Sequence, residues 1–505
     1  MLLFQEVMTV QNAELAARVA WPLFLTFLLM LAVSSLTARR SGHLAALISV
    51  ALLAYADLAL MQFRIGRIDH HSVMILCTAP GILLLCDSFT RRASGFAAGT
   101  LFGIAAAVGY EALPVILCAS GLAALLSVAG GRGREGILAA AITFASVLTI
   151  AFVITVAPSA WLQNACDALS MNLVIFAWGA AAAVGAGGAV RQRLGIAPAI
   201  AVLGLVTLAG IGMALASEPR CIAGPLGLID PAIGPIWLSH IDETRSIPEL
   251  LVEEPVLAAP ALLTFCAGLY FLAAQTRSRR DEYQILMVGA FLATSILAAT
   301  QAKFLPYMSL LAVPPIAAGI AGIGPTARLS ATSRRLIAFL ALNQRIVMGA
   351  MVLLMSVPDA IHGRSSAEAE KAAKDCYAPS AYAGLASLPP GLVFAHINLG
   401  PYIVAYTPHA ALAGPYHRLD TAAIEYHAIA SASPHAALGR LQRIGVRYVL
   451  SCSGLTRTPG AGPDSFFAHL ANGEVPDGLT PISLQGEGAL KIWEVTEETG
   501  AGRGD

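Results

Sequence analysis

Charged residues are scarce in this 505-residue sequence, since Asp, Glu, Lys and Arg together make up only 12% of it. That share is about half of what soluble proteins usually carry, and it excludes a soluble enzyme. Neither sign of charge is in excess, because 31 Lys and Arg balance 31 Asp and Glu, and the chain has no acidic or basic tail. A nucleic-acid-binding protein is therefore not indicated. Hydrophobic residues instead make up 57% of the chain, which favours a membrane protein.

Apolar runs of about 17–22 residues recur from the N-terminal region to about residue 357. As helices, such runs are long enough to cross a hydrocarbon core of about 30 Å. The sequence thus predicts an α-helical polytopic membrane domain over residues 1–357. We expect twelve spans, at about residues 15–37, 44–62, 71–87, 94–109, 112–129, 136–156, 173–190, 197–217, 255–274, 284–300, 305–322 and 336–357.

The basic residues predict the orientation of these spans, because Arg and Lys near span ends are retained on the cytoplasmic side. They cluster after the first, third, fifth, seventh, ninth and eleventh spans, which are alternate connections. The clusters are Arg39/Arg40, Arg91/Arg92, Arg132/Arg134, Arg191/Arg193, Arg277/Arg279/Arg280 and Arg328/Arg334/Arg335. If these loops are cytoplasmic, the chain begins outside, and the loops at 156–172 and 218–254 and the C-terminal tail also lie outside. The expected location is the inner (plasma) membrane.

The tail, residues 358–505, has the composition of a small α/β domain, with charged residues, Ser and Pro returning. Short apolar runs predict strands at Leu392–Phe394, Tyr402–Val404 and Val446–Leu450. An amphipathic stretch, Ala436–Arg443, follows Pro434 and closes at Gly445, which is typical of a helix with a C-terminal Gly. We expect this domain to be extracytoplasmic (periplasmic).

The eight cysteines divide evenly between spans and exterior segments. Those within spans are expected to be small buried hydrophobic residues: Cys77, Cys86, Cys118 and Cys266. Of the others, two lie in the exterior loops and two flank the tail domain. An oxidising exterior would permit two disulfides between them, Cys166–Cys221 and Cys376–Cys452.

The densest polar cluster near a span end runs from Arg64 to His71, at the exterior end of the second span. Ionisable groups at a membrane face often mark a functional site. Asp69 and His71 offer a carboxylate oxygen and an imidazole nitrogen, which suit one divalent cation of the Mn²⁺ or Mg²⁺ type. Arg64 and Arg67 are suited to hold a phosphate through forked hydrogen bonds. The alternative is an interfacial cap, in which Asp69 only N-caps the third span.

Two further exterior segments carry charges that fit the same chemistry. In the loop His240–Arg245, Glu243 or Asp242 could complete the metal shell and act in catalysis, or the loop is simply a solvated acidic segment. Lys303, between two spans, would serve as a point charge for a lipid phosphate, although a plain headgroup contact also explains it. Asp57 and Glu111 are interpreted as hydrogen-bonding groups inside the bundle or as interfacial caps.

Together, the exterior Asp69-His70-His71 at a span end, a loop element similar to Thr-Ile-x-Glu and an exterior C-terminal domain resemble the catalytic subunits of oligosaccharyltransferases. These are GT-C fold, polyprenyl-dependent glycosyltransferases. The resemblance implies that Asp69 and His71 bind metal and that Glu243 serves metal or acceptor. That family has thirteen spans and an N-terminus inside, so the twelve counted here look like its pattern without the first span. The catalytic aspartate of its first exterior loop would then lie upstream of Met1.

The acceptor side departs from the family pattern. Where the family has Trp-Trp-Asp-Tyr-Gly, the segment Ala395–Tyr402 has no tryptophan, and Asn398 stands in the place of the aspartate. The resemblance therefore implies lipid-linked sugar chemistry rather than recognition of a protein N-glycosylation sequon. Tyr416, His417 and Arg418 are polar and aromatic enough to line an acceptor cleft, or else they belong to the domain surface.

We therefore expect a metal-assisted membrane glycosyltransferase that moves a sugar from a polyprenyl phosphate or diphosphate to an acceptor on the exterior face. One alternative is a transporter or lipid flippase in which Asp57, Asp69, His70 and His71 form an ion path. Another is a non-catalytic relic or accessory subunit of the same fold, which a missing aspartate loop would favour.

Overall fold

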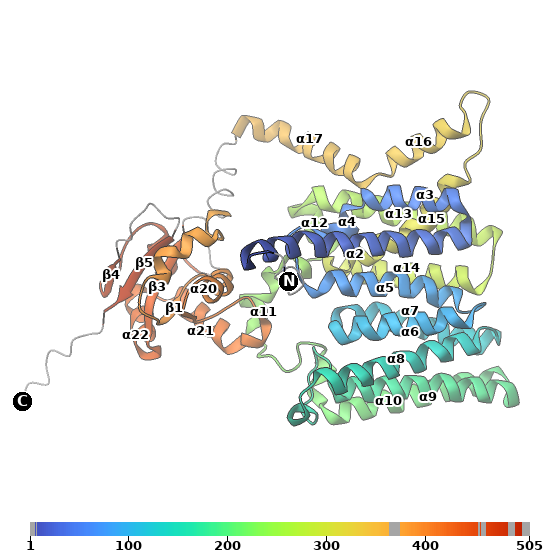
Figure 1. The fold of residues 1–505 in the computed structure, drawn as a ribbon, viewed down its shortest axis with the longest axis horizontal. Helices are drawn as coiled ribbons and strands as arrows, with labels where there is room; N and C mark the ends of the chain where they lie inside the picture. The colour runs from blue at the N-terminus through green and yellow to red at the C-terminus, as the bar shows by residue number, and fades with distance from the viewer. Residues whose placement is uncertain are drawn as a thin grey trace, which may run out of the picture. The chain divides into compact units, whose positions relative to one another are not determined.

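Long apolar helices make up most of the first part of the chain in the computed structural model, and a small mixed sheet lies in the last part (Figure 1). The structure describes residues 6, 8–362, 374–452, 455, 461–482 and 490–496. The chain separates into two units. The first comprises Met1–Leu228 and Arg245–Met355, and the second comprises Ile229–Thr244 and Ser356–Asp505. The segment Ile229–Thr244 thus belongs with the C-terminal part.

The first unit is a bundle of helices joined by short connections. Its helices are α2 (Val10–Ser41), α3 (His43–Ala54), α4 (Asp57–Leu60), α5 (His70–Asp87), α6 (Arg92–Val108), α7 (Leu113–Gly130), α8 (Arg134–Thr155), α9 (Met171–Leu194), α10 (Ile196–Ser217), α12 (Ile247–Glu253), α13 (Pro255–Ser278), α14 (Glu282–Thr300), α15 (Leu305–Ala321), α16 (Ala331–Ala341) and the start of α17 (Gln344–His362). Single 3₁₀ turns lie between them, namely η1 (Met61–Phe63), η2 (Tyr110–Ala112), η3 (Pro158–Ala160), η4 (Pro219–Ala223) and η7 (Ala302–Phe304).

Within the described residues, nine helices are long and apolar enough to cross a membrane, or up to eleven if each of two bent pairs is one span. The bent pairs are α3 with α4 and η1, and α16 with α17. The remaining expected span coincides with α6, an apolar helix of 17 residues. Each expected span thus coincides with a helix, and the polytopic class is confirmed. The count of twelve stays a prediction.

The two bent spans are joined to each other by polar side chains. The amide oxygen of Gln344, at the start of α17, accepts a hydrogen bond from the Leu58 N–H at 3.1 Å. Its amide nitrogen donates to the hydroxyls of Thr264 and Ser309, at 2.8 and 2.9 Å. Arg345 also pairs with Asp57, at 2.7 Å. A bend frees backbone groups that lipid cannot satisfy, so side chains of one bent span partner the backbone of the other.

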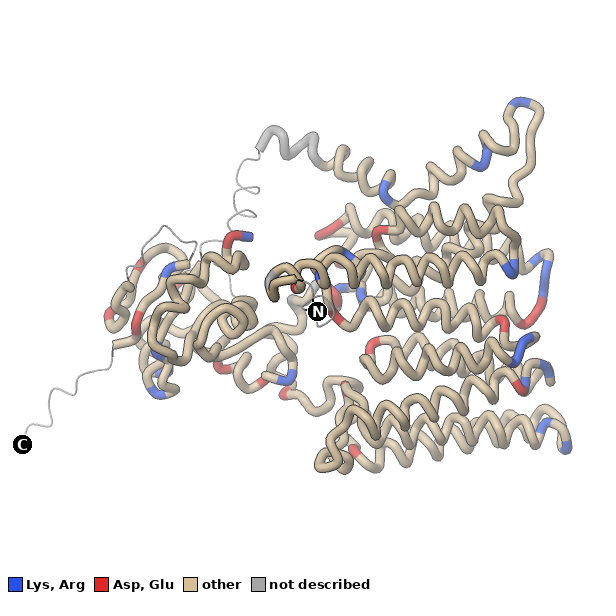
Figure 2. Tube along the Cα trace, in the orientation of Figure 1, with Lys and Arg blue, Asp and Glu red and all other residues tan. Residues whose placement is uncertain are grey.

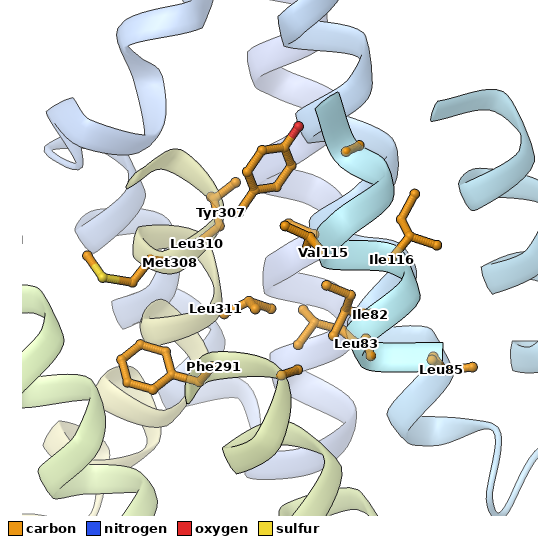
Figure 3. Packing of buried hydrophobic residues seen from close by; sticks show 14 of the residues in the cluster. Ile82, Leu83, Leu85, Val115, Ile116, Phe291, Tyr307, Met308, Leu310 and Leu311 are labelled. Carbon is orange, nitrogen blue, oxygen red and sulfur yellow. The ribbon is translucent and has the colours of Figure 1, made fainter. Parts of the chain in front are cut away.

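The core of the bundle lies where α5, α7, α14 and α15 meet (Figure 3). Ile82, Val115, Phe291 and Leu311 belong to this buried cluster, and each is at most 2% exposed. Helix α15 is the most deeply buried of the candidate spans within the described residues. Both α5 and α15 begin at the same end of the bundle, so this packing fixes the positions of their first residues.

Glycines allow α6 to approach α8 closely. A Cβ atom at Gly95 would lie 2.0 Å from the carbonyl oxygen of Gly136, and one at Gly99 would lie 2.2 Å from that of Ala140. Either side chain would force the two backbones apart, so small residues set this contact, as they do in many membrane helix pairs. The contact holds α6 in place, and the chain runs from α6 directly into η2.

Figure 2 shows that Lys and Arg gather at one end of the helix bundle. Arg39 and Arg40 lie in the last turn of α2, Arg191 and Arg193 in that of α9, and Arg277 in that of α13. We call this the basic end. Helices α5, α7 and α15 begin at the opposite end, where η2 and η7 lie. The segregation is the pattern expected of a cytoplasmic face, and the orientation stays a prediction.

The second unit contains a five-stranded sheet of order β2-β1-β3-β5-β4. Strand β1 pairs in parallel with β2 and β3, whereas β5 pairs antiparallel with β3 and β4. The strands are β1 (Leu392–Phe394), β2 (Ala410–Ala411), β3 (Val446–Cys452), β4 (Leu479–Pro481) and β5 (Leu490–Val495). The helical elements are α11 (Ile233–Ile236), η5 (Leu238–His240), η6 (Asp242–Thr244), η8 (Pro379–Tyr382), α19 (Ala383–Ala386), η9 (Ile397–Leu399), α20 (Gly400–Tyr406), η10 (His417–Leu419), α21 (Asp420–Ala430), α22 (Pro434–Ile444) and α23 (Phe466–Ala471).

The segment that precedes Arg245 is part of the core of this second unit. Ile233 of α11 is 1% exposed and belongs to the cluster that contains Phe394 and Tyr426. The Asp230 N–H also donates to the Asp420 carboxylate at 2.8 Å. Part of the long loop expected between α10 and α13 is therefore an element of the α/β unit.

The local predictions for the tail are mostly confirmed. Strands β1 and β3 and helix α22, which ends at a left-handed Gly445, lie where the sequence indicated. The strand predicted at Tyr402–Val404 is wrong, because these residues lie in α20. Pro401 occupies the first turn of that helix, where its missing N–H costs nothing.

The cysteines occupy three environments. Disulfides join Cys166 to Cys221 and Cys376 to Cys452, the two pairings expected from the sequence. Cys77 and Cys86 are free and buried, as expected. The expectation of burial is wrong for two others, since Cys118 and Cys266 are exposed on the surface of the bundle. A hydrophobic span has a lipid-facing side, and a small apolar residue is stable there too.

Candidate active site

Asp69 joins the start of α5 to the loop before it. Its Oδ1 accepts a hydrogen bond from the His71 N–H at 3.1 Å, which caps the helix. Its Oδ2 pairs with the Arg67 guanidinium. The capping function that the sequence left as an alternative is therefore present. The same carboxylate also lies near an imidazole, because Oδ1 is 3.7 Å from Nδ1 of His71.

His71 lies between two carboxylates. Its Nε2 is 2.9 Å from Oε2 of Glu111, which is carried by η2 between α6 and α7. The other oxygen of Glu111 is 3.9 Å from Nζ of Lys303, on η7. Three connections at one end of the bundle thus contribute to one row of ionisable groups: Arg67, Asp69, His71, Glu111 and Lys303. We call this set the charged row.

The members of the charged row are partly buried. Their side chains are between 15% exposed, for His71, and 36% exposed, for Arg67. Such groups remain reachable by a ligand, yet they interact more strongly than charges in bulk water. Buried neighbours hold the two short turns in place, since Ala112 follows Glu111 with 0% exposure and Phe304 follows Lys303 with 4%.

Three groups in this region have the geometry of a metal site. One ligand atom each of His70, His71 and Glu111 lies within 4.8 Å of the others. Two imidazole nitrogens and one carboxylate oxygen suit Mn²⁺, Zn²⁺ or Fe²⁺ better than Mg²⁺, which prefers oxygen ligands. The set shares only His71 with the predicted one of Asp69, His71 and Glu243, because it has His70 and Glu111 in place of Asp69 and Glu243. In the sequence analysis, Glu111 was interpreted as a hydrogen-bonding group or an interfacial cap and was not placed with the histidines.

The remaining predicted residues of the membrane site lie nearby in sequence or in the other unit. Arg64 is exposed in the loop that also carries Arg67. Glu243 lies on η6 in the second unit, and the side chain of Asp242 is outside the described residues. The first unit resumes at Arg245, whose carbonyl oxygen accepts a hydrogen bond from the Ala302 N–H at 2.8 Å. The role of Glu243 stays a prediction.

In the second unit, the two segments expected on the acceptor side lie next to each other. A Cβ atom at Gly400 would lie 2.2 Å from the Ala413 carbonyl oxygen, so the start of α20 packs directly on the turn before η10. Asn398 is exposed just before this contact, and Tyr416, 54% exposed, lies just after it. His417 and Arg418 follow on η10. The close approach requires glycine at position 400.

Comparisons with known proteins give a result for structure alone. No protein-family model matches the sequence, and no curated protein does. Among solved structures, the oligosaccharyltransferase AglB of Archaeoglobus fulgidus, in complex with an inhibitory peptide and a dolichol-phosphate, matches with a TM-score of 0.64 and 15% identity. The match covers 99% of this chain and 65% of that one.

The chain has the GT-C fold. Two other structures of the archaeal enzyme agree. The apo form matches with a TM-score of 0.62 and 16% identity over 97% of this chain and 64% of that one. The complex with Zn and sulfate matches with a TM-score of 0.57 and 16% identity over 94% and 61%. The resemblance inferred from the sequence is thus confirmed at the level of the fold. The chain spans about 65% of the length of the archaeal protein.

Proposed function

We propose that the chain is a membrane glycosyltransferase that transfers a sugar from a polyprenyl phosphate or diphosphate to an acceptor. The observation that carries the proposal is the group of His70, His71 and Glu111 within the charged row, on a GT-C fold. The archaeal protein of this fold has been solved with dolichol-phosphate and with Zn and sulfate, so it accepts a lipid phosphate, a metal and an anion.

The chemistry of the donor explains why a row of charges is useful. Transfer breaks the bond between the sugar C1 and the phosphate oxygen, while C1 forms a bond to the acceptor nucleophile and that nucleophile gives up its proton. The leaving lipid phosphate gains negative charge. A divalent cation held by His70, His71 and Glu111 would neutralise part of that charge. Arg67 and Lys303 add fixed positive charges at the two ends of the row, and preorganised charges of this kind need no rearrangement during the reaction.

The protein's own side chains also determine where the ligands point. Asp69 caps α5 through the N–H of His71, and this fixes the first turn from which both histidines project. Nζ of Lys303 lies 3.9 Å from Oε1 of Glu111, so the ammonium group helps to orient that carboxylate. Arg64 is exposed on the adjoining loop and is free of the constraint that the Asp69 contact places on Arg67. We propose it as the group that meets the lipid phosphate first.

Manganese binding tests the site directly. Electron paramagnetic resonance of the purified full-length chain should show about one bound Mn²⁺ per protein, and Glu111→Gln should weaken that binding at least about tenfold, since a carboxylate ligand is lost. Glu135→Gln is the matched control, because Glu135 is an 80% exposed carboxylate on α8, outside the charged row. Equal Mn²⁺ binding by wild type and Glu111→Gln would contradict the site.

Donor consumption tests the reaction. Labelled polyprenyl-phosphate sugars reconstituted with the wild-type chain should be consumed in Mn²⁺, and consumption should stop in EDTA and in Glu111→Gln. Glu243→Gln tests the predicted contribution of the exterior loop to the same reaction. Consumption that continues unchanged in EDTA would contradict metal assistance, while a chain that binds Mn²⁺ but consumes no lipid-linked sugar would favour the accessory role.

A lipid flippase or transporter is the second candidate, and one observation favours it. Bent spans with polar contacts between them, such as the Asp57–Arg345 pair and the Gln344 hydrogen bonds, also occur in transporters. A reconstituted flippase would move a fluorescent polyprenyl phosphate between leaflets, and Asp57→Asn would reduce that rate. Glu111→Gln would leave it unchanged, so the two functions are distinguishable.

A further inference from the structure

A partly polar cavity lies at the basic end of the bundle, away from the charged row. It has a volume of about 500 Å³ and is bounded by α2, α13, α14 and α15. Small-molecule sites commonly measure about 300–1,000 Å³, so this one is large enough for a headgroup. Arg40 and Arg279 are among its lining residues, and the described lining residues include no Asp or Glu.

Two glutamines give the cavity fixed polar walls. Gln275 of α13 donates from Nε2 to the Pro315 carbonyl oxygen of α15 at 2.8 Å. Gln284 of α14, 3% exposed, donates from Nε2 to the Leu272 carbonyl oxygen at 3.3 Å. Pro314 and Pro315 also line the cavity, and the Gln275 contact ties α13 to α15 at this level. The cavity is thus built into the helix packing.

The two arginines of the cavity are held differently. Arg40 pairs with Asp281 and lies over the Tyr283 ring, with Cζ 4.4 Å from the ring centroid. Burial alone would raise the pKa of Asp281, but the hydrogen bonds from Arg40 and the Gln284 N–H outweigh burial and lower that pKa. Arg279 is exposed and forms no ion pair within 4 Å in the part of the chain that the structure describes. Arg40 is therefore held in one orientation, whereas Arg279 is available to bind an anion.

An apolar surface continues from the cavity along α13. Leu262, Leu269 and Tyr270 are 42%, 38% and 68% exposed, and their spacing of seven and eight residues places them on one face of the helix. Tyr270 also lines the cavity. A ligand that fits both parts has an anionic head and a hydrocarbon chain.

We propose that this cavity binds the phosphate headgroup of an anionic membrane phospholipid, with its acyl chains along the exposed face of α13. Arg279 and Arg40 would bind the phosphate oxygens, as basic sites between membrane helices do for anionic lipid heads. Figure 2 shows that Lys and Arg gather at this end of the bundle, which adds long-range attraction for an anion. The site is separate from the charged row, and it does not depend on the proposed sugar transfer.

Native mass spectrometry of the full-length chain tests the proposal. Detergent-purified protein is titrated with phosphatidylglycerol or with phosphatidylcholine of the same acyl length. Wild type should retain phosphatidylglycerol preferentially, and Arg279→Gln should weaken that binding about tenfold, because a charge-assisted contact is lost. Arg193→Gln, on α9 at the same end but outside the cavity, is the matched control and should bind as wild type does.

A second variant tests the cavity without changing charge. Gly322 lines the cavity, and its φ of −74° is one that any residue can adopt. A Cβ atom at this position would lie 3.4 Å from its nearest neighbour, the Gly319 carbonyl oxygen, so the backbone accommodates a side chain. Gly322→Leu should therefore fill the space and also lower phosphatidylglycerol binding. Equal binding by wild type and Arg279→Gln, or an equal loss in Arg193→Gln, would overturn the proposal. Displacement of the lipid by millimolar inorganic phosphate would overturn it too, because the site would then select a free anion.

Discussion

Asp69 is a carboxylate with two separable contributions, a helix cap and a negative charge. Its Oδ1 accepts from the His71 N–H, and its Oδ2 pairs with Arg67. Asparagine caps helices about as well as aspartate does, but it carries no charge. The two contributions can therefore be tested by different substitutions at one position.

We expect Asp69→Asn to lower Mn²⁺-dependent donor consumption about 10- to 100-fold while thermal stability and membrane insertion stay unchanged. The physical reason is that the cap survives, whereas the negative charge beside His71 and Arg67 is lost. Activity and a thermal melt measured on the same preparation check this. Asp69→Ala removes the cap as well, and it should lower the free energy of unfolding by about 1 kcal/mol. Full activity in Asp69→Asn would show that the carboxylate only caps α5.

At the scale of single residues, the sequence identified four of the five members of the charged row as site residues, all except Glu111. Asp69, His71 and Lys303 could be recognised because a polar group at the end of a long apolar run is conspicuous. Glu111 was visible for the same reason, but its partner was not. It meets His71 only because η2 lies beside the start of α5, and that depends on how α5, α6 and α7 pack. Sequence spacing carries no information about such a contact.

At the scale of elements, predictions succeeded where one periodicity dominated. The apolar runs became helices, and α22 ended at Gly445 as its pattern indicated. The predictions failed where an apolar run was short. Tyr402–Val404 fits a strand or a helix equally well, and Pro401 in the first turn favours the helix. The bends after Ala54 and before Gln344 were also missed. A polar residue within an apolar run, such as Asp57, was the available signal.

The contact between Asp420 and Asp230 joins two elements and gives a prediction for pH. Hydrogen bonds from the Asp230 N–H and then the Thr421 N–H lower the pKa of Asp420 below its usual value of 3.8. A lowered pKa stabilises the folded form above about pH 4, and this contribution is lost as the pH falls through the lowered pKa. The protection factors for amide hydrogen exchange in residues 229–236, which correct for the intrinsic effect of pH, should therefore fall below about pH 4.

Asp420→Ala should show the same fast exchange already at neutral pH, because the acceptor oxygen is absent. Asp420→Asn keeps one acceptor oxygen, so it should protect residues 229–236 in part and remove the dependence on pH. Exchange that is slow in Asp420→Ala would mean that burial of Ile233 alone holds the segment.

At the scale of the whole molecule, each unit is stabilised by its own means. The first depends on helix packing in the bundle, and the second has a small sheet, two buried clusters and a disulfide. A disulfide destabilises the unfolded chain most when it closes a long loop. The Cys376–Cys452 pair is separated by 76 residues, and both cysteines are at most 2% exposed.

We expect Cys376→Ser to lower the free energy of unfolding of the second unit by about 4 kcal/mol. The melting transition of that unit should shift down in the variant, and reductant should reproduce the shift in the wild-type chain. Cys266→Ser, which replaces a free and exposed cysteine, is the control and should melt like the wild type. A wild-type melt that is insensitive to a strong reductant would contradict the prediction.

The other disulfide limits how the chain threads the bilayer. Cys166 follows α8 and Cys221 follows α10, so the bond ties two connections together on one side. Between the two cysteines the chain passes through α9 and α10, and it must therefore cross the membrane an even number of times. Any topology in which one of these helices crosses and the other does not is excluded. A tag placed in either connection has to report the same compartment.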